Sequence, residues 1–134
     1  MIIDSSAIIA ILADEDDAPL YAGAIAQTSS CRISAANYVE SAVVIETLSP
    51  IEGTRQFDAF MRLAGITIEP VTAEQAFLAR QAYADYGKGR HPAGLNFGDC
   101  FSYALAKAYR EPLLYKGQDF ARTDILPALN SERS

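Results

Sequence analysis

The sequence is poor in the residues that build several common kinds of site. It has one histidine, His91, and two cysteines, Cys31 and Cys100, which lie far apart and match no metal-binding spacing. Histidine-rich zinc sites, mechanisms that need two histidines and Cys-x-x-Cys metal sites are therefore excluded. Because no secretion signal precedes the cysteines, we expect both thiols to be reduced.

Long hydrophobic runs and targeting segments are also missing. Half of the residues are hydrophobic, but no run approaches the roughly 20 apolar residues of a membrane span. The amino terminus has no basic segment before its apolar run, and Asp4 interrupts that run. We therefore predict neither a signal peptide nor a transit sequence, and we expect a cytoplasmic location without a membrane partner.

Positive charge is scarce, with 11 Lys and Arg against 17 Asp and Glu and a formal net charge of −6. This balance argues against broad, nonspecific affinity for nucleic acid, which normally needs a basic face. It does not exclude a nucleic-acid enzyme, because clustered acids can hold divalent cations whose own charge reverses the local field. A dinucleotide-binding protein is disfavoured, because no G-x-G-x-x-G follows the first apolar run.

What the sequence does contain is an alternation of short apolar runs and helical patterns. Strands are expected near 1–3, 31–34, 66–68 and 113–115, and helices over 6–12, 19–27, 35–48, 55–64, 73–86 and 97–109. Ser34, Thr72 and Asn96 each precede a helical stretch and are predicted N-caps. Strands separated by helices predict an α/β fold, a three-layer α/β/α sandwich around a mainly parallel sheet. Residues 1–134 are expected to form a single domain with a frayed tail over 130–134.

Four acidic residues stand where such a sheet would bind a ligand. Asp4 follows the first strand, Glu40 lies in the helix 35–48, Asp99 begins the helix 97–109, and Asp119 follows the last strand. Each residue has an ordinary alternative role: Asp4, Asp99 and Asp119 suit helix caps or first turns, and Glu40 can be a surface residue.

Glu40 shares its predicted helix face with Ala36, Val43 and Val44, so its carboxylate would be costly to bury without a partner. Close carboxylates raise one another's pKa. A cluster of them with no specified counter-charge makes most sense around a divalent cation. Oxygen ligands without histidine or thiolate favour Mg²⁺ or Mn²⁺ over Zn²⁺.

Four stretches of the sequence resemble a known family. They read Ile-Ile-Asp-Ser-Ser-Ala-Ile from residue 2, Tyr-Val-Glu from 38, Asn-Phe-Gly-Asp-Cys-Phe-Ser-Tyr-Ala-Leu-Ala from 96 and Leu-Leu-Tyr-Lys-Gly-Gln-Asp-Phe from 113. Together they resemble the PIN domain and, more narrowly, the VapC-type ribonuclease toxins of bacterial toxin–antitoxin systems. The resemblance spans nearly the whole chain, and the segment 88–99 is especially distinctive of one toxin branch.

The resemblance implies a PIN-like α/β/α fold and a Mg²⁺- or Mn²⁺-dependent endoribonuclease that is neutralised by a small cognate antitoxin. It implies Asp4 and Asp99 as metal ligands, Glu40 as a further acid of the pocket, and Ser6 as a hydroxyl that orients Asp4. A homodimer or a toxin–antitoxin hetero-oligomer is the implied assembly. Many relatives carry another acid two residues before Asp119, where this chain has glycine. Asp119 then substitutes for that acid, acts through a water or only caps the next helix.

The predicted chemistry is hydrolysis of an RNA phosphodiester by metal-activated water, which Glu40 or Asp119 positions or deprotonates. Cys100 is interpreted as a core residue rather than a nucleophile. One alternative is a catalytically silent PIN-like module that binds RNA or protein, with Gly117 marking a damaged site. Another is an α/β phosphohydrolase of small phosphate esters. It is disfavoured because Asp4-Ser5-Ser6 lacks the second aspartate of an Asp-x-Asp motif.

Several residues are candidates for contacts with RNA or with an antitoxin. Each set has an alternative: a solvated or ion-paired surface for the basic residues, and the core for the apolar and aromatic ones. The basic candidates are Lys88, Arg90 and His91, then Arg80, Lys116 and Arg122; the base-stacking candidates are Tyr83, Tyr86 and Phe97; an antitoxin groove would use Ile8, Ile11, Leu12, Leu20 and Tyr21.

Overall fold

The computed structural model describes residues 1–129, so the predicted fraying of 130–134 lies outside the described residues. The strands are β1 (Ile2–Ile3), β2 (Arg32–Ser34), β3 (Thr67–Glu69) and β4 (Leu113–Leu114). The helices are α1 (Ser5–Leu12), α2 (Ala18–Ala26), α3 (Ala35–Leu48), α4 (Glu52–Ala64), α5 (Ala73–Tyr86) and α6 (Phe97–Tyr109), followed by a 3₁₀ helix, η1 (Phe120–Arg122). Every expected strand and helix is present, with ends displaced by a few residues at most.

The strands form one parallel sheet in the order β3-β2-β1-β4. The chain runs outward from β1 through β2 to β3 and then returns to place β4 on the other side of β1. Ile2 pairs with Arg32 in β2 and with Leu113 in β4. The strand order thus reverses between β1 and β4, and open parallel sheets bind ligands beyond the carboxyl ends of their strands at such a reversal.

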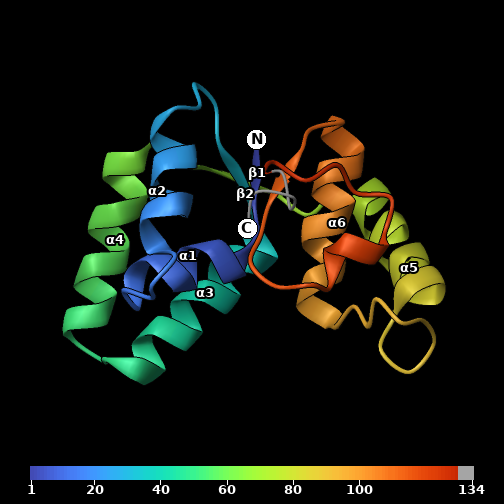
Figure 1. Cartoon of the computed structure of the whole chain (residues 1–134), viewed down its shortest axis with the longest axis horizontal. Coiled ribbons are helices and arrows are strands. Elements are labelled where there is room, and N and C mark those ends of the chain that lie inside the picture. The colour runs from blue at the N-terminus through green and yellow to red at the C-terminus, as the bar shows by residue number, and fades with distance from the viewer. Residues whose placement is uncertain (130–134) are drawn as a thin grey trace.

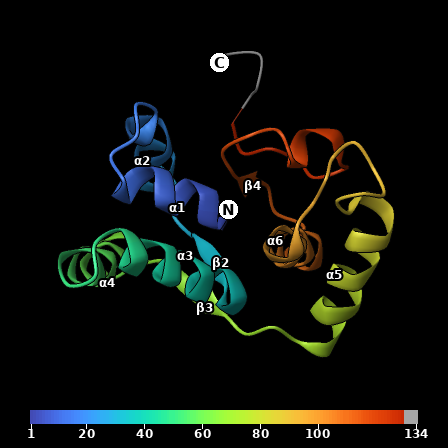
Figure 2. The same ribbon diagram turned by 90° about the horizontal axis from the view of Figure 1, so that it is seen from below.

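Helices cover both faces of this sheet. Helices α1 to α4 lie on one side and α5 and α6 on the other, as the two views in Figures 1 and 2 show. The predicted three-layer α/β/α arrangement with a parallel sheet is therefore confirmed. None of the helices in the described residues is long and apolar enough to cross a membrane.

The short strands divide the core in two, because successive side chains of a strand point to opposite faces. Ile3 and Leu114 pack with residues of α1 to α4, whereas Ile2 and Leu113 pack with residues of α5 and α6. All four side chains are fully buried. A central parallel strand needs apolar residues on both faces, which explains why β1 and β4 are uninterrupted apolar pairs.

The predicted N-caps are confirmed, and they fix where three helices begin. Ser34, Thr72 and Asn96 each accept a hydrogen bond from a backbone N–H two or three residues further on, at the starts of α3, α5 and α6. At α6 the cap is reciprocal, since Asp99 Oδ2 accepts from the backbone N–H of Asn96 at 3.0 Å. A side-chain cap of this kind contributes about 1 kcal/mol.

The apolar residues of α1 and α2 belong mainly to the core. Ile8 and Tyr21 are buried in the cluster around Ile3, and Ile11 and Leu12 pack against the same cluster. Leu20 is half exposed. Of the two readings for these residues, core or antitoxin groove, the structure supports the core for all but Leu20.

We expect Leu105→Ala in α6 to lower the free energy of unfolding by about 2–5 kcal/mol, because it leaves a cavity in a close-packed core. Leu105 is fully buried, whereas Leu63 in α4 is 83% exposed and provides the matched control. Urea unfolding at constant m-value measures the difference. Equal urea midpoints for Leu105→Ala and Leu63→Ala would contradict the assignment of Leu105 to the core between the sheet and helices α5 and α6.

Candidate functional site

A cavity of about 210 Å³ opens at the carboxyl edge of the sheet, beside the reversal between β1 and β4. Its lining comes from α1, α3, the start of α6 and the segment that follows β4. Asp4, Glu40, Asp99 and Asp119 all line it. The topology thus brings to one place four acids that are widely separated in the sequence.

Asp4 is both a helix cap and a wall of this cavity. It is the N-cap of α1 and is 2% exposed. Its Oδ2 accepts hydrogen bonds from the backbone N–H of Ser6 at 3.0 Å and from the Ser6 hydroxyl at 2.6 Å, and its Oδ1 accepts one from the Ser102 hydroxyl of α6. Burial raises the pKa of Asp4, and the negative charge of Glu40 adds to the rise, while the three hydrogen bonds oppose it.

Asp99 likewise combines two roles. It closes the capping box of α6 and lines the cavity. Burial raises the pKa of Asp99 from its ordinary value of 3.8 to about 8. The hydrogen bond from the Asn96 backbone opposes this rise, whereas the carboxylates of Asp4 and Asp119 add to it. The acids of the cavity therefore disfavour one another's ionised form.

Asp119 stands before η1, but its side chain makes no capping hydrogen bond. The reading in which Asp119 only caps the next helix is therefore wrong. Asp119 is exposed and lies at the cavity. Gly117, where the family resemblance implies a further acid, has a φ of 102°, a conformation that L side chains rarely adopt. Asp119 is the acid that this loop brings to the cavity.

Glu40 is locked between three helices. Its Oε1 accepts from the Ser5 hydroxyl of α1 at 2.6 Å and from Asn37 Nδ2 of α3 at 3.2 Å. Asn37, which is fully buried, also donates to the backbone oxygen of Gly98 in α6 at 2.9 Å. A Cβ built on Gly98 would lie 2.3 Å from Glu40 Oε2, so any larger residue here would displace the Glu40 carboxylate. Sequence reasoning missed Ser5, Asn37 and Gly98, because their contacts arise only where the helices meet.

The apolar stripe expected around Glu40 is only partly present, because Val44 lines the cavity beside Glu40 but Val43 faces solvent. Val43 is 57% exposed, and the buried residues of α3 are Asn37, Ser41 and Ile45. The Ser41 hydroxyl donates to the backbone oxygen of Asn37 at 2.7 Å, and the Asn37 amide donates to Glu40 and Gly98, so both small polar side chains use their donors inside the interface. They allow α3 to pack closely on its neighbours, and Glu40 stands at the border of that face.

The cation nearest to these acids in the lining is Lys116, and its ammonium group is paired elsewhere. Lys116 lines the cavity, and its backbone N–H donates to the Ser6 hydroxyl at 2.9 Å. Its ammonium group is engaged by Glu15 and, at 3.1 Å, by Asp17, and these hydrogen bonds raise the pKa of Lys116. The acidic run that follows α1 therefore holds this cation, and the cavity acids have no ion pair among the described residues.

The donor set fits a hard divalent cation. The acids lining the cavity offer only oxygen atoms, which Mg²⁺ and Mn²⁺ prefer. Cys100 lies outside the lining and is buried as expected; burial and the charge of Asp99 raise the pKa of its thiol to about 11, which disfavours a thiolate nucleophile. Within residues 1–129 no three His, Cys, Asp or Glu side chains already converge on one point. Asp4 and Asp99 as metal ligands stay a prediction.

The basic loop after α5 is more structured than a solvated loop. His91 Nδ1 accepts from the backbone N–H of Ala93 at 3.0 Å, and its ring meets Tyr86 edge-on at 5.1 Å. Tyr86 packs against the core cluster of α5 and α6, which supports its core reading. The Arg90 guanidinium lies 5.5 Å from the centre of the Tyr83 ring. An RNA contact by Arg90 or His91 stays a prediction.

The fold and this cavity define a class of protein, and comparison with known proteins gives the same class. The model of the PIN domain family matches residues 1–126, and the chain belongs to that family. It is 54% identical to Ribonuclease VapC28 of Mycobacterium tuberculosis over 97% of this chain and 98% of that protein. It is 51% identical to Ribonuclease VapC of Mycolicibacterium smegmatis, over 93% and 97% of the two chains. The resemblance to PIN domains of the VapC type is confirmed.

Solved structures show the same fold at lower identity. One is Mycobacterium tuberculosis VapC20, described as a toxin that cleaves the sarcin–ricin loop, with a TM-score of 0.75, 17% identity and coverage of 93% of this chain and 95% of that one. Another is a toxin–antitoxin complex from Klebsiella pneumoniae, with a TM-score of 0.71, 17% identity and coverage of 96% and 98%.

Asp99→Asn should stabilise the metal-free protein at alkaline pH. The folded protein keeps a proton on Asp99 up to about pH 8, whereas the unfolded chain releases it near the ordinary pKa of 3.8. The free energy of unfolding therefore falls as pH rises through this interval. Asparagine removes the charge and keeps an oxygen that can accept the Asn96 N–H.

Thermal unfolding in EDTA at pH 5 and pH 8 measures this effect. We expect a smaller drop in Tm between the two pH values for Asp99→Asn than for the parent. The control Asp58→Asn, at an exposed position of α4, should show the same drop as the parent. A parent-like drop for Asp99→Asn would contradict the electrostatic account.

Proposed function

We propose that this chain is a Mg²⁺- or Mn²⁺-dependent endoribonuclease that acts as the toxin of a toxin–antitoxin pair. The observation that carries the proposal is the cavity at the strand-order reversal. There Asp4, Glu40, Asp99 and Asp119 line one cavity, and burial raises the pKa of Asp4 and Asp99. Membership of the PIN domain family and 54% identity to a VapC ribonuclease support the same activity.

Asp4 and Asp99 would hold the cation, with Asp119 at the exposed side of the cavity. When bound, a divalent cation would offset the negative charge of the scissile phosphate and lower the pKa of the attacking water. The hydrogen bonds of Ser6 and Ser102 hold both oxygens of Asp4, so this carboxylate is pre-oriented. Little rearrangement is then needed during the reaction.

Glu40 is the best-placed group to orient the water and accept its proton. Its Oε1 is held by Ser5 and Asn37, and its Oε2 lies against Gly98 at the start of α6. A base held from three sides keeps its carboxylate in one position relative to Asp99. Proton transfer by a positioned carboxylate contributes roughly 10²–10⁴-fold to the rate of such reactions.

The proposed partners are RNA as substrate and a cognate antitoxin protein as inhibitor. A structural neighbour is a toxin–antitoxin complex, and the curated relatives carry VapC ribonuclease names. Assembly as a homodimer or as a toxin–antitoxin hetero-oligomer, a cytoplasmic location and a single domain over 1–134 stay predictions.

A catalytically silent PIN-like module that binds RNA or protein is the second candidate function. The observation that favours it is Gly117, which stands where the family resemblance implies a further acid and whose φ of 102° disfavours any side chain. The presence of Asp119 at the same cavity argues for the enzyme instead.

Asp4→Asn and Asp99→Asn should each abolish Mg²⁺-dependent cleavage of RNA, because each removes a charged ligand of the cation. The control Asp58→Asn on α4 should cleave RNA like the parent. Cleavage is followed with structured RNA in a contaminant-free preparation, and circular dichroism checks the fold. Undiminished cleavage by both cavity variants would refute the proposed site.

Expression in bacteria separates the two candidate functions. If expression is toxic, and if both co-expression of the cognate antitoxin and the substitution Asp99→Asn relieve the toxicity, the ribonuclease toxin is supported. Harmless expression of a folded protein that binds RNA without cleaving it supports the silent module.

Gly98→Ala should reduce activity without reducing stability. The new methyl group displaces the Glu40 carboxylate, and we expect kcat to fall by about 10–100-fold, the usual effect of disturbing groups that hold an active site. The substitution should stabilise helix α6 itself, since alanine is about 1 kcal/mol more favourable than glycine in a helix. Gly23→Ala in α2, where nothing lies within 4 Å of the new Cβ, is the control and should keep full kcat. A parent-like kcat for Gly98→Ala would contradict the role given to Glu40.

A further inference from the structure

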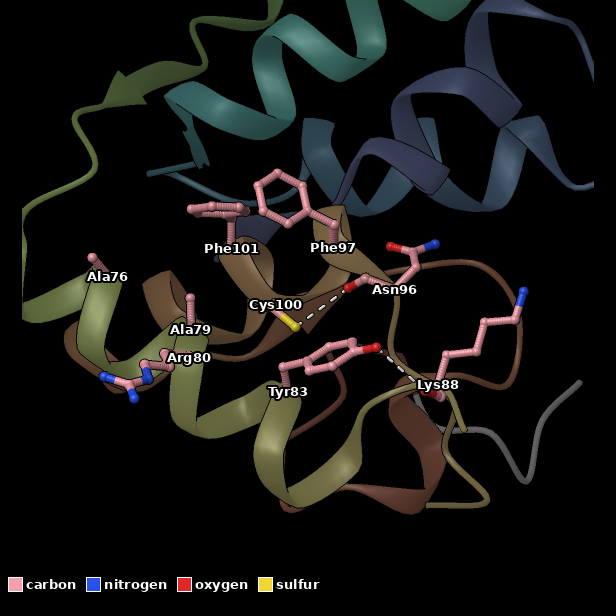
Figure 3. A pocket seen from close by; sticks show the side chains of 9 residues that line it. All are labelled: Ala76, Ala79, Arg80, Tyr83, Lys88, Asn96, Phe97, Cys100 and Phe101. Atoms are coloured by element: carbon pink, nitrogen blue, oxygen red, sulfur yellow. Dashed lines mark hydrogen bonds between the residues drawn. The ribbon is translucent and has the colours of Figure 1, made fainter. Parts of the chain in front are cut away.

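A second cavity, of about 580 Å³, lies between α5 and α6 (Figure 3). Alanine and cysteine side chains form much of its lining, the rings of Tyr83, Phe97 and Phe101 stand at it, and Arg80 and Lys88 carry charge to it. None of these residues has a role in the chemistry of the acidic cavity. A mainly apolar cavity with aromatic rings and a few polar groups is the usual form of a small-ligand site.

We propose that this second cavity binds an unpaired nucleobase of the RNA substrate, next to the phosphodiester held at the acidic cavity. This inference rests on the proposed ribonuclease function and adds a subsite to it. The rings stack on the base, and Lys88 and Arg80 contact the flanking phosphates.

The two cavities meet at one residue. Asn96 lines both of them. Its side chain accepts from the Asp99 backbone N–H at 2.9 Å, and its own backbone N–H donates to Asp99 Oδ2 at 3.0 Å. A nucleotide whose phosphate lies beside Asp99 therefore has the second cavity within reach of its own base or that of its neighbour.

The aromatic side chains at this cavity are unusually accessible. Phe97 is 79% exposed and Tyr83 is 40% exposed. Both are oriented rather than free: Phe97 packs edge-on against Phe101 at 4.9 Å, and the Tyr83 hydroxyl donates to the backbone oxygen of Lys88 at 3.4 Å. Unpaired bases of RNA stack on such rings, and a stacking contact contributes about 1–3 kcal/mol.

The charges favour RNA over a protein as the occupant. In a chain of net charge −6, Arg80 and Lys88 line this cavity and Arg90 lies over the Tyr83 ring. Within residues 1–129 none of the three has a carboxylate within 4.0 Å, whereas Lys116 and Lys107 are both ion-paired. Unpaired cations at the rim of an aromatic cavity suit a phosphate backbone, and they would be costly to bury against an apolar protein face.

The first test measures binding of fluorescein-labelled, single-stranded oligouridylate and oligoadenylate to the full chain in EDTA, where cleavage is prevented. Phe97→Ala should weaken binding about tenfold, and Phe77→Ala, which removes an exposed phenylalanine of α5 outside the cavity, should leave it unchanged. Lys88→Ala should lower the slope of log K against log salt by about 1. Arg62→Ala, an unpaired exposed cation on α4, should not change the slope.

The second test uses an abasic oligomer of the same length, which keeps the phosphates and lacks the bases. The parent should bind the base-containing oligomer about tenfold more tightly, and Phe97→Ala should lose most of this preference. An equal preference in parent and variant would overturn the proposal, as would failure of the parent to bind either oligomer. Sedimentation velocity adds a further outcome: if Phe97→Ala converts a dimer to a monomer and leaves the base preference intact, the cavity is an interface between copies of this chain.

The results separate this inference from the proposed function. If the parent cleaves RNA and Phe97→Ala binds and cleaves as well as the parent, the subsite is wrong and the ribonuclease stands. If Phe97→Ala loses the base preference while the parent cleaves nothing with Mg²⁺ or Mn²⁺, the subsite stands and the ribonuclease is wrong.

Discussion

A carboxylate buried at the end of the central strand is the constraint on which the rest of the site depends. Asp4 is 2% exposed, and the hydroxyl groups of Ser6 and Ser102 donate to its two oxygens. Its backbone N–H donates to Leu114 in β4 at 2.9 Å, so the carboxylate stands where the strand order reverses. Burial of this kind stabilises the neutral form of the acid, and the neighbouring acids reinforce the effect. A bound cation would relieve both costs at once.

The surrounding helices hold this unfavourable arrangement in place. Ser102 connects Asp4 to α6, and Asn37 connects Glu40 to Gly98 at the beginning of the same helix. The acids therefore cannot separate without breaking contacts between α1, α3 and α6. The two cores on either side of the sheet supply the stability that such strain requires. This exchange of stability for a pre-oriented site is common where function needs charges close together.

Two cavities of opposite charge lie side by side on this protein. The acidic cavity suits a cation and a scissile phosphate, and the aromatic cavity beside it has cations at its rim. Asn96 belongs to both. A polyanion can bind an acidic protein when its phosphates meet the rim cations and when a metal ion covers the carboxylates, which reconciles a net charge of −6 with a nucleic-acid substrate.

The sequence by itself determined the order of strands and helices, the caps and the acids at the carboxyl edge. Short apolar runs that alternate with helical patterns favour a parallel sheet covered by helices, and Ser34, Thr72 and Asn96 act on backbone groups only a few residues away. Motifs at the ends of the strands also sufficed for the resemblance to the PIN family.

Only the tertiary structure decided which side chains meet across elements. It paired Lys116 with Glu15 and Asp17, placed Glu40 against Gly98, exposed Val43 and Phe97, and packed the partly buried Tyr86 against the core. Periodicity in a sequence gives the face of a helix but not how closely another helix approaches it. That distance depends on packing between residues far apart in the chain, and it decides whether a carboxylate or a ring ends at the surface, in a core or beside a ligand.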